Sequence, residues 1–151
     1  MRKLQALTKA LKDAGVSDDT IYSFADQGVL TPTGKDLGHG FEVGFFKYDA
    51  VIQVESYEDD AYSLLAFITT WLQMNDPDRE DQGLADPNID ISLNDNSTAD
   101  VELAVEFEES LQIVPDESGP IMYDGQQYKV ADVPIDVAEG LDNMEGGTDA
   151  K

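Results

Sequence analysis

The side chains that could carry chemistry are few, and the first of them is the only histidine, His39. It lies between Gly38 and Gly40 in a stretch rich in glycine. A histidine that acts as a general base needs an orienting partner and a nucleophile within reach. No nucleophile motif stands near His39, and the chain has no cysteine. The same stretch lacks the Lys-Ser/Thr ending of a phosphate-binding loop. We therefore interpret His39 as a loop residue without a catalytic role.

Three acids, Glu106, Glu108 and Glu109, stand close together and have the residue type needed for acid–base chemistry. Glycosidases, however, place such carboxylates in a cleft and take them from separate elements. Three acids on one predicted strand are more typical of a solvated face, or of an edge protected against stray strand pairing. Because the sequence shows no other catalytic arrangement, we predict a protein that is not an enzyme and needs no cofactor.

Two clusters of oxygen-bearing side chains raise the question of a cation site. Asp86, Asn88 and Asp90 have the spacing of the first ligands of a calcium loop. The EF-hand pattern also requires Gly at its sixth position and Glu at its twelfth, and these positions hold Ile91 and Ser97. A hairpin turn explains the second cluster more simply; it consists of Asn94, Asp95, Asn96 and Asp100. We predict no metal site, with adventitious binding of a divalent cation between Asp86 and Asp100 as the alternative.

The charge of the chain is divided unevenly. Residues 1–47 hold six of the nine Lys/Arg and six acids, so their net charge is zero. Residues 48–151 hold three cations and 26 acids, which gives −23. Such a surface repels free nucleic acid and anionic membranes. Two unit charges about 4 Å apart interact by roughly 4 kcal/mol at an effective dielectric near 20, so acids cannot be stacked in an interface without cations between them. We therefore expect the N-terminal cations to contact an acidic face of a neighbouring subunit or partner: Arg2, Lys3, Lys9, Lys12, Lys35 and Lys47.

The N-terminal part of the chain carries the signals of a helical hairpin over residues 1–30. Apolar residues recur on one helical face over residues 4–14 and are followed by a glycine. A second helix is predicted over Ser17–Gly28, because a serine cap is followed by acids in the first turn. Residues 31–40 contain one proline and three glycines and are predicted to be a loop.

Residues 41–135 predict a mostly antiparallel sheet with one long helix packed on it, which is an α+β fold. Phe41–Phe46 and Ala50–Tyr57 are rich in aromatic and β-branched residues and predict a hairpin that turns near residues 47–49. The helix is predicted over Asp59–Met74, from its broad apolar face. The remaining strands are predicted at Ile89–Leu93, at Val101–Phe107 with Leu111–Val114 as a continuation or bend, and on both sides of a tight turn at Asp124-Gly125.

The core is predicted where the long helix meets the sheet. One domain over residues 1–140 would contain it, and the acidic, glycine-rich residues 141–151 predict a flexible tail. The longest strongly apolar stretch, residues 64–72, is too short to span a bilayer, and no export signal is visible. The predicted core residues are Leu64, Leu65, Ile68, Trp71, Val101, Leu103 and Val105.

Four stretches of the chain follow one another in a recognisable order: LQALTKALKDAGVSDDTIYSFADQGVL, YDAVIQVESYEDDAYSLLAFITTWLQMNDPD, IDISLNDNSTADVELAVEFEE and YDGQQYKV. Together they resemble the phage tail completion protein family, the R-type tail completion proteins of contractile-tailed temperate phages. The likeness covers roughly residues 4–133. Its most specific piece is the helix end LAFITTWL with the acidic, proline-containing loop and the strand that follow. These are packing motifs, so the resemblance carries over no functional residue.

The resemblance implies a structural protein of the virion, in the neck region at the head-proximal end of the tail, made in the host cytoplasm. Tail terminators of this kind look like α+β subunits closed into six-fold rings. The implied partners are other copies of the chain, the tail tube, the tail sheath and the head–tail connector, which the ring would cap and join. DNA would pass through without specific binding, and no membrane is involved.

Two other functions compete with a tail ring. An acidic inhibitor that imitates DNA would show carboxylates at phosphate-like spacing on one exposed element, whereas the acids here are spread through loops and element ends. A small hydrolase would need the nucleophile and base that the sequence lacks. We keep the DNA mimic as the alternative.

Overall fold

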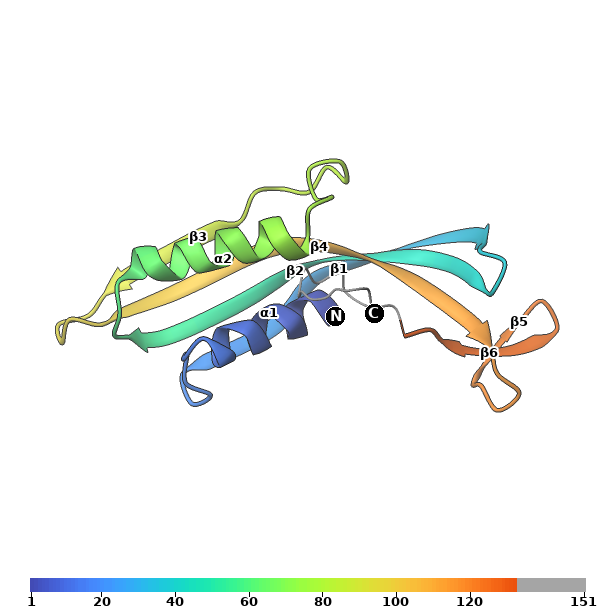
Figure 1. Ribbon diagram of the computed structural model, residues 1–151, viewed down its shortest axis with the longest axis horizontal. Coiled ribbons are helices and arrows are strands. Elements are labelled where there is room, and N and C mark those ends of the chain that lie inside the picture. Colours follow the sequence, from blue (N-terminus) through green and yellow to red (C-terminus); the bar gives the residue numbers. More distant parts are fainter. Residues whose placement is uncertain (133–151) are drawn as a thin grey trace.

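A computed structural model describes residues 1–132, in which two helices pack on a curled antiparallel sheet (Figure 1). The predicted tail, residues 141–151, lies outside the described residues. In chain order the elements are α1 (Arg2–Asp13), β1 (Ile21–Asp36), β2 (Phe41–Tyr57), α2 (Ala61–Asn75), β3 (Asn88–Leu93), β4 (Ala99–Pro115), β5 (Ile121–Tyr123) and β6 (Gln126–Val130).

The sheet is organised around its two longest strands, β2 and β4, which pair along almost their whole length. The strand order is β1-β2-β4-β6-β5, and all pairs are antiparallel. Strand β3 also pairs with β4, beside the first half of that strand, while β6 pairs with its last residues. Among the described strands, β1 therefore has a partner on one side only, and so does β3.

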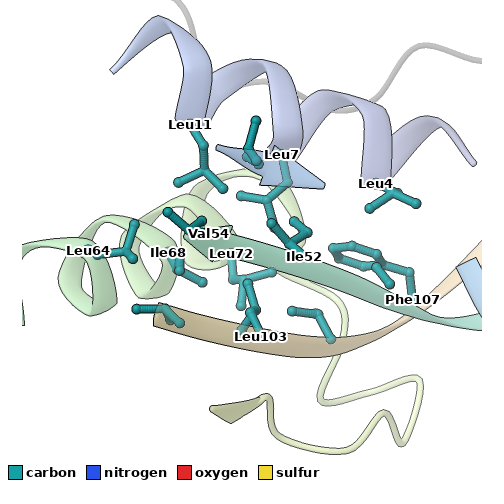
Figure 2. Packing of buried hydrophobic residues seen from close by; sticks show 14 of the residues in the cluster. Leu4, Leu7, Leu11, Ile52, Val54, Leu64, Ile68, Leu72, Leu103 and Phe107 are labelled. Carbon is teal, nitrogen blue, oxygen red and sulfur yellow. The ribbon is translucent and has the colours of Figure 1, made fainter. Parts of the chain in front are cut away.

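Alternation along the central strands decides which face carries the helices. Tyr48, Ala50, Ile52 and Val54 of β2 stand opposite Phe107, Val105, Leu103 and Val101 of β4, and all eight side chains are buried. The apolar faces of both helices pack onto the face of the sheet that carries these eight side chains, which we call the helix face (Figure 2). Burying a valine, leucine, isoleucine or phenylalanine side chain contributes about 1.5–3 kcal/mol, so this layer stabilises the fold strongly.

The helices cover only part of the elongated sheet (Figure 1). The covered half comprises β3 and the parts of β1, β2 and β4 that lie within residues 21–26, 48–57 and 99–107. The bare half comprises the rest of β1, β2 and β4 together with β5 and β6. The strand pairing is continuous between the two halves; register shifts occur in β1 and β2 of the bare half and between Val54 and Tyr57 of the covered half.

The predicted helical hairpin over residues 1–30 is wrong in its second arm. The first helix is present as α1, but the segment predicted as the helix Ser17–Gly28 contains the start of β1. Ile21, Ser23 and Ala25 pair with inward-facing residues of β2, so a period of two replaces the expected helical period. Pairing with a long neighbouring strand outweighed the local capping signal, as tertiary contacts commonly do.

The predicted loop at residues 31–40 is confirmed only for residues 37–40, and the predicted turn at residues 47–49 is wrong. Strand β1 continues to Asp36, and the chain reverses over residues 37–40, where the N–H of Leu37 donates to the carbonyl of Gly40 at 2.8 Å. Residues 41–57 form a single strand, β2. Tyr48 is buried opposite Phe107, between two polar residues that point to the other face. The polar, apolar and polar residues at positions 47–49 therefore reflect the alternation of side chains along a strand, and no turn forms there.

The other predicted elements are present. The long helix appears as α2, whose N-terminus is capped by Asp60 through a 3.1 Å hydrogen bond from the N–H of Tyr62. Residues 99–115 form one strand, and the turn at Asp124-Gly125 joins β5 to β6. The sheet carries two helices, however, where one long helix was predicted. Of the predicted core residues, Leu65 and Trp71 are half-buried, and Leu64, Ile68, Val101, Leu103 and Val105 are buried.

Candidate functional site

The residues singled out for catalysis are not brought together. His39 is exposed in the turn between β1 and β2. Glu106 and Glu108 point to one face of β4, and Glu109 points to the other. Glu106 accepts a hydrogen bond from the N–H of Ala85 at 3.0 Å and lies 3.8 Å from the Lys47 ammonium. Glu109 has a structural role, because it holds the start of α1 against the sheet.

The Glu109 carboxylate accepts hydrogen bonds from the first turn of α1. The backbone N–H groups of Arg2 and Lys3 donate to it at 3.0 and 3.1 Å, and the Tyr48 hydroxyl donates to it as well. The Tyr48 hydroxyl also accepts from the N–H of Leu4 at 3.3 Å. A carboxylate at a helix N-terminus satisfies orphan N–H donors and interacts favourably with the helix dipole. We call Glu109, Tyr48 and the first turn of α1 the N-terminal latch.

The pKa values within the latch follow from its burial and hydrogen bonds. Burial alone would raise the pKa of the Glu109 carboxyl, but the hydrogen bonds from Tyr48, Lys3 and Arg2 outweigh it and hold this pKa below its ordinary value. Burial raises the pKa of the Tyr48 phenol, and the hydrogen bond to Glu109 raises it further. The latch therefore consists of a neutral phenol and an ionised carboxylate at neutral pH.

A second polar cluster lies beside the latch, at the end of α2. Asp76 is almost fully buried and bridges two cations, with its carboxylate oxygens 2.7 Å from the Lys3 ammonium and 2.7 Å from the Arg79 guanidinium. Arg79 also donates to the carbonyls of Glu106 and Ala85, at 3.1 and 2.8 Å. A buried charge must be paired and hydrogen-bonded to be tolerated. This cluster ties α1, α2 and β4 together.

Sequence analysis missed both clusters. It placed Tyr48 in a turn and gave Asp76 no role. One signal was available, because Arg79 is the only cation between residues 48 and 128 and follows Asp76 by three residues. A lone cation in such an acidic stretch is a candidate for a buried pair.

The oxygen-rich segments serve local structure. Asn88 and Asp90 stand on the exposed face of β3, and Asp86 lies in the loop before that strand. Asp100 accepts from the N–H of Ser56 at 2.9 Å and from the Asn94 side chain at 3.0 Å, and these hydrogen bonds lower its pKa. Over residues 1–132, no cluster of three or more His, Cys, Asp or Glu is arranged to hold a metal ion.

The N-terminal cations differ in how available they are. Lys3 is held in the Asp76 cluster, and the Arg2 guanidinium donates to the carbonyl of Ala131 at 2.8 Å. Lys9 and Lys12 of α1 lie beside Asp13 and Asp18, at 2.6 and 3.4 Å. Their side chains are 76% and 41% exposed, and exposed pairs of this kind contribute little to stability. Lys35 and Lys47 are exposed on β1 and β2 of the bare half. Four of the six cations are therefore accessible to a partner: Lys9, Lys12, Lys35 and Lys47.

The face of the sheet opposite the helix face is acidic in the covered half. No helix of residues 1–132 covers this open face. Register places acids from all four strands on it, interrupted by Tyr22, Phe24 and Val51. The acids are Asp26, Asp49, Asp90, Asp100, Glu102 and Glu106. Neither α1 nor α2, the two helices of the described residues, is long and apolar enough to cross a membrane.

Comparison with known proteins agrees with a structural role. A family model described as P2 phage tail completion protein R (GpR) matches residues 1–132. A protein of Haemophilus phage HP1 (strain HP1c1), described as an uncharacterized 19.2 kDa protein in the rep-hol intergenic region, is 28% identical over 125 residues, which make up 80% of this chain and 75% of that protein. No solved structure matches the chain. The resemblance drawn from the sequence motifs is confirmed: the chain belongs to the P2 phage tail completion protein R family and is a structural protein of a phage tail.

Proposed function

We propose that the chain is a ring subunit at the head-proximal end of the tail, where the ring caps the tube and sheath and meets the head connector. The observation that carries this proposal is the family match across residues 1–132. The elongated sheet adds support, because it has a free strand at each side of its covered half. Copies of such a subunit can join side by side without unfolding.

The charge distribution fits a channel for DNA. In a ring, the acidic open face would point to the lumen or to solvent, and a lumen of this charge repels passing DNA and keeps it from sticking. The exposed cations, Lys9 and Lys12 among them, would contact acidic faces of neighbouring subunits or tail partners. The alternative of a DNA mimic draws on the same acidic face alone, whereas the family match favours the tail.

Removing the gene from the phage that encodes this chain tests the proposal. Electron micrographs of the lysate should show heads and tails that remain separate, because the joining ring is missing. Supplying the wild-type chain should restore joined virions, and the His39→Ala variant should restore them equally well. Normal yields of joined virions without the gene would contradict the proposal.

Sedimentation of the purified chain across a salt series tests the role of charge. The screening length shortens to roughly 3 Å at 1 M salt, so like-charge repulsion fades and assembly should be favoured or little harmed. Reversing Lys9→Glu together with Lys12→Glu should weaken association and leave the subunit folded. A ring held equally well by the double variant would refute the charge argument, and a chain that stays monomeric with its tail partners present would refute the ring.

A further inference from the structure

The two free edges of the covered half differ in how well they are protected. An open edge strand exposes unpaired N–H and C=O groups, which proteins usually protect with prolines, lysines, bulges or short strands. The part of β1 in the bare half has such protection, with Pro32, Lys35 and two register shifts. The first run of β1, Ile21–Asp26, has no proline, lysine or register shift. Its Tyr22 and Phe24 are 49% and 47% exposed. Strand β3 is similarly open, and its Leu93 is 83% exposed.

These two unprotected edges have the same length, stand at the same level along the sheet and run in opposite directions. Both regular runs have six residues, Ile21–Asp26 and Asn88–Leu93. The pairings place Ile21, Val54, Val101 and Ile91 in one row across the sheet, so the runs stand at the same level. The strands β1, β2, β4 and β3 alternate in direction. If a second copy is rotated about an axis along the strands, its β1 therefore lies antiparallel to β3 of the first copy.

The two edges differ in net charge. Residues 2–26, which include α1 and the first run of β1, hold four cations and four acids, so their net charge is zero. Residues 58–93, which include α2 and β3, hold nine acids and Arg79, which gives −8. Two acidic edges would repel each other, whereas a neutral edge with accessible lysines can approach an acidic one.

Each edge also has a groove between its helix and its strand. Leu4, Thr8, Lys9 and Lys12 of α1 line the first groove together with Ser23 and Phe24 of β1. The second groove lies between α2, the loop that follows it and β3, and its lining residues include Leu65, Arg79, Glu80, Asp86 and Ile89. When the two edges meet, these grooves face each other, with lysines opposite acids.

We propose that β1 of one copy adds to β3 of the next, so that the neutral α1–β1 edge of each subunit covers the acidic α2–β3 edge of its neighbour. The contact is heterologous, which is the type that closes into a ring when the rotation permits. This inference rests on the proposed ring and specifies which surfaces form it. The partner is a second copy of this chain, and the contact lies in the covered half of the sheet.

Engineered cysteines can test the contact because the chain has no cysteine of its own. Tyr22→Cys and Asp90→Cys in one chain stand on opposite edges, three strand spacings or roughly 14 Å apart, whereas a disulfide needs Cα atoms within about 7 Å. Any disulfide is therefore intermolecular. Under mild oxidation, non-reducing gels should show a ladder of covalent multimers. Two companion chains, Tyr22→Cys with Asn88→Cys and Tyr22→Cys with Ser92→Cys, allow for a register two residues either way.

The single variants distinguish the possible arrangements. Tyr22→Cys alone and Asp90→Cys alone should stay monomeric on the gel. An efficient covalent dimer of either single variant would show that like edges meet, and it would overturn the inference. Light scattering or purified virions could show an oligomer while none of the three double variants forms a ladder. That result would refute the β1–β3 contact but would leave the proposed ring intact. If the wild-type chain is monomeric throughout, including with tail partners, both fall.

Charge reversal gives an independent readout of the same contact. Lys9→Glu with Lys12→Glu should lower the association constant by about tenfold or more, because like charges would then face each other. Adding Glu80→Lys and Asp86→Lys to the same chain should restore association. The matched control is Lys35→Glu with Lys129→Glu, which changes the same net charge in the bare half and should act more weakly. Equal loss in the control, or no rescue by the compensating pair, would overturn the inference.

Discussion

The covered and bare halves share their strands but are held together by different interactions. In the covered half, β2 and β4 bury a continuous apolar layer beneath two helices. In the bare half, burial is concentrated in a small cluster in which Phe41, Tyr123 and Tyr128 meet edge to face, with ring centroids 5.1 to 6.0 Å apart. The comparison teaches that strand pairing sets the shape of the whole sheet, whereas helix packing sets its stability. The bare half should therefore open at a lower free energy than the covered half.

The largest effect should come from Phe107→Ala. This side chain is fully buried in the covered half, with the rings of Tyr48 and Trp71 at 6.0 and 6.4 Å. Its removal should cost about 3–5 kcal/mol, which is a large part of the stability of an ordinary domain. Urea unfolding measures the cost. Trp71→Ala should cost less, since Trp71 is half-buried. An unchanged urea midpoint for Phe107→Ala would contradict the conclusion that helix packing in the covered half sets the stability.

Asp76→Asn should have the next largest effect. The substitution leaves Lys3 and Arg79 without their shared counter-ion, and the side chains of both cations are mostly buried, with exposures of 17% and 15%. We expect a loss of about 2–3 kcal/mol, the scale of hydrogen bonds to charged groups. The matched control is Asp13→Asn, which removes the exposed pair with Lys9 and should change the urea midpoint little. Equal effects of the two variants would show that the buried cluster is not a stabilising tie.

The latch predicts how stability depends on pH. The pKa of Glu109 is lower in the folded chain than in the unfolded chain, so its stabilising contribution is complete above the unfolded value of about 4.3. That contribution should be lost as the pH falls through the lower, folded pKa. Unfolding midpoints measured between about pH 3 and pH 6 should therefore fall less steeply for Glu109→Gln than for the parent. Parallel curves would mean that other carboxylates carry the acid sensitivity.

The smallest effect should come from Tyr123→Ala, in the bare half. Aromatic pairs contribute about 0.5–1.5 kcal/mol beyond the area they bury, and here they hold a three-residue strand. Amide hydrogen exchange should become faster in β5 and β6, while exchange in β2 and β4 of the covered half stays unchanged. Faster exchange throughout the chain would instead show that both halves unfold as one unit.

Elements that bury an apolar face in the covered half were predicted from the sequence, whereas β1, which is held mainly by strand pairing, was not. Helix α1, helix α2 and the first part of β4 have periodic apolar residues because each buries one face, and all three were predicted. The strand β1 was missed because 14 of its 16 residues are exposed, so its side chains leave little periodic signal. Its conformation is set by pairing with β2, which is a long-range contact. The N-terminal latch was missed for a related reason, since Glu109 is 106 positions from Lys3 and nothing local links them.

The central position of β4 has a consequence for synthesis. Strands β1 and β2 are consecutive and can pair as soon as Tyr57 has been made, but the other edge of β2 stays open until β4 is complete at Pro115, 58 residues later (115 − 57). At about 5–20 residues per second, this interval lasts roughly 3–12 s. Nascent chains with such an edge would pair with one another when a virion protein is made in quantity. The acids just before α2, at residues 58–60, and those of the loop after it, at residues 76–86, emerge in that interval, so mutual repulsion would keep neighbouring nascent chains apart until β4 arrives.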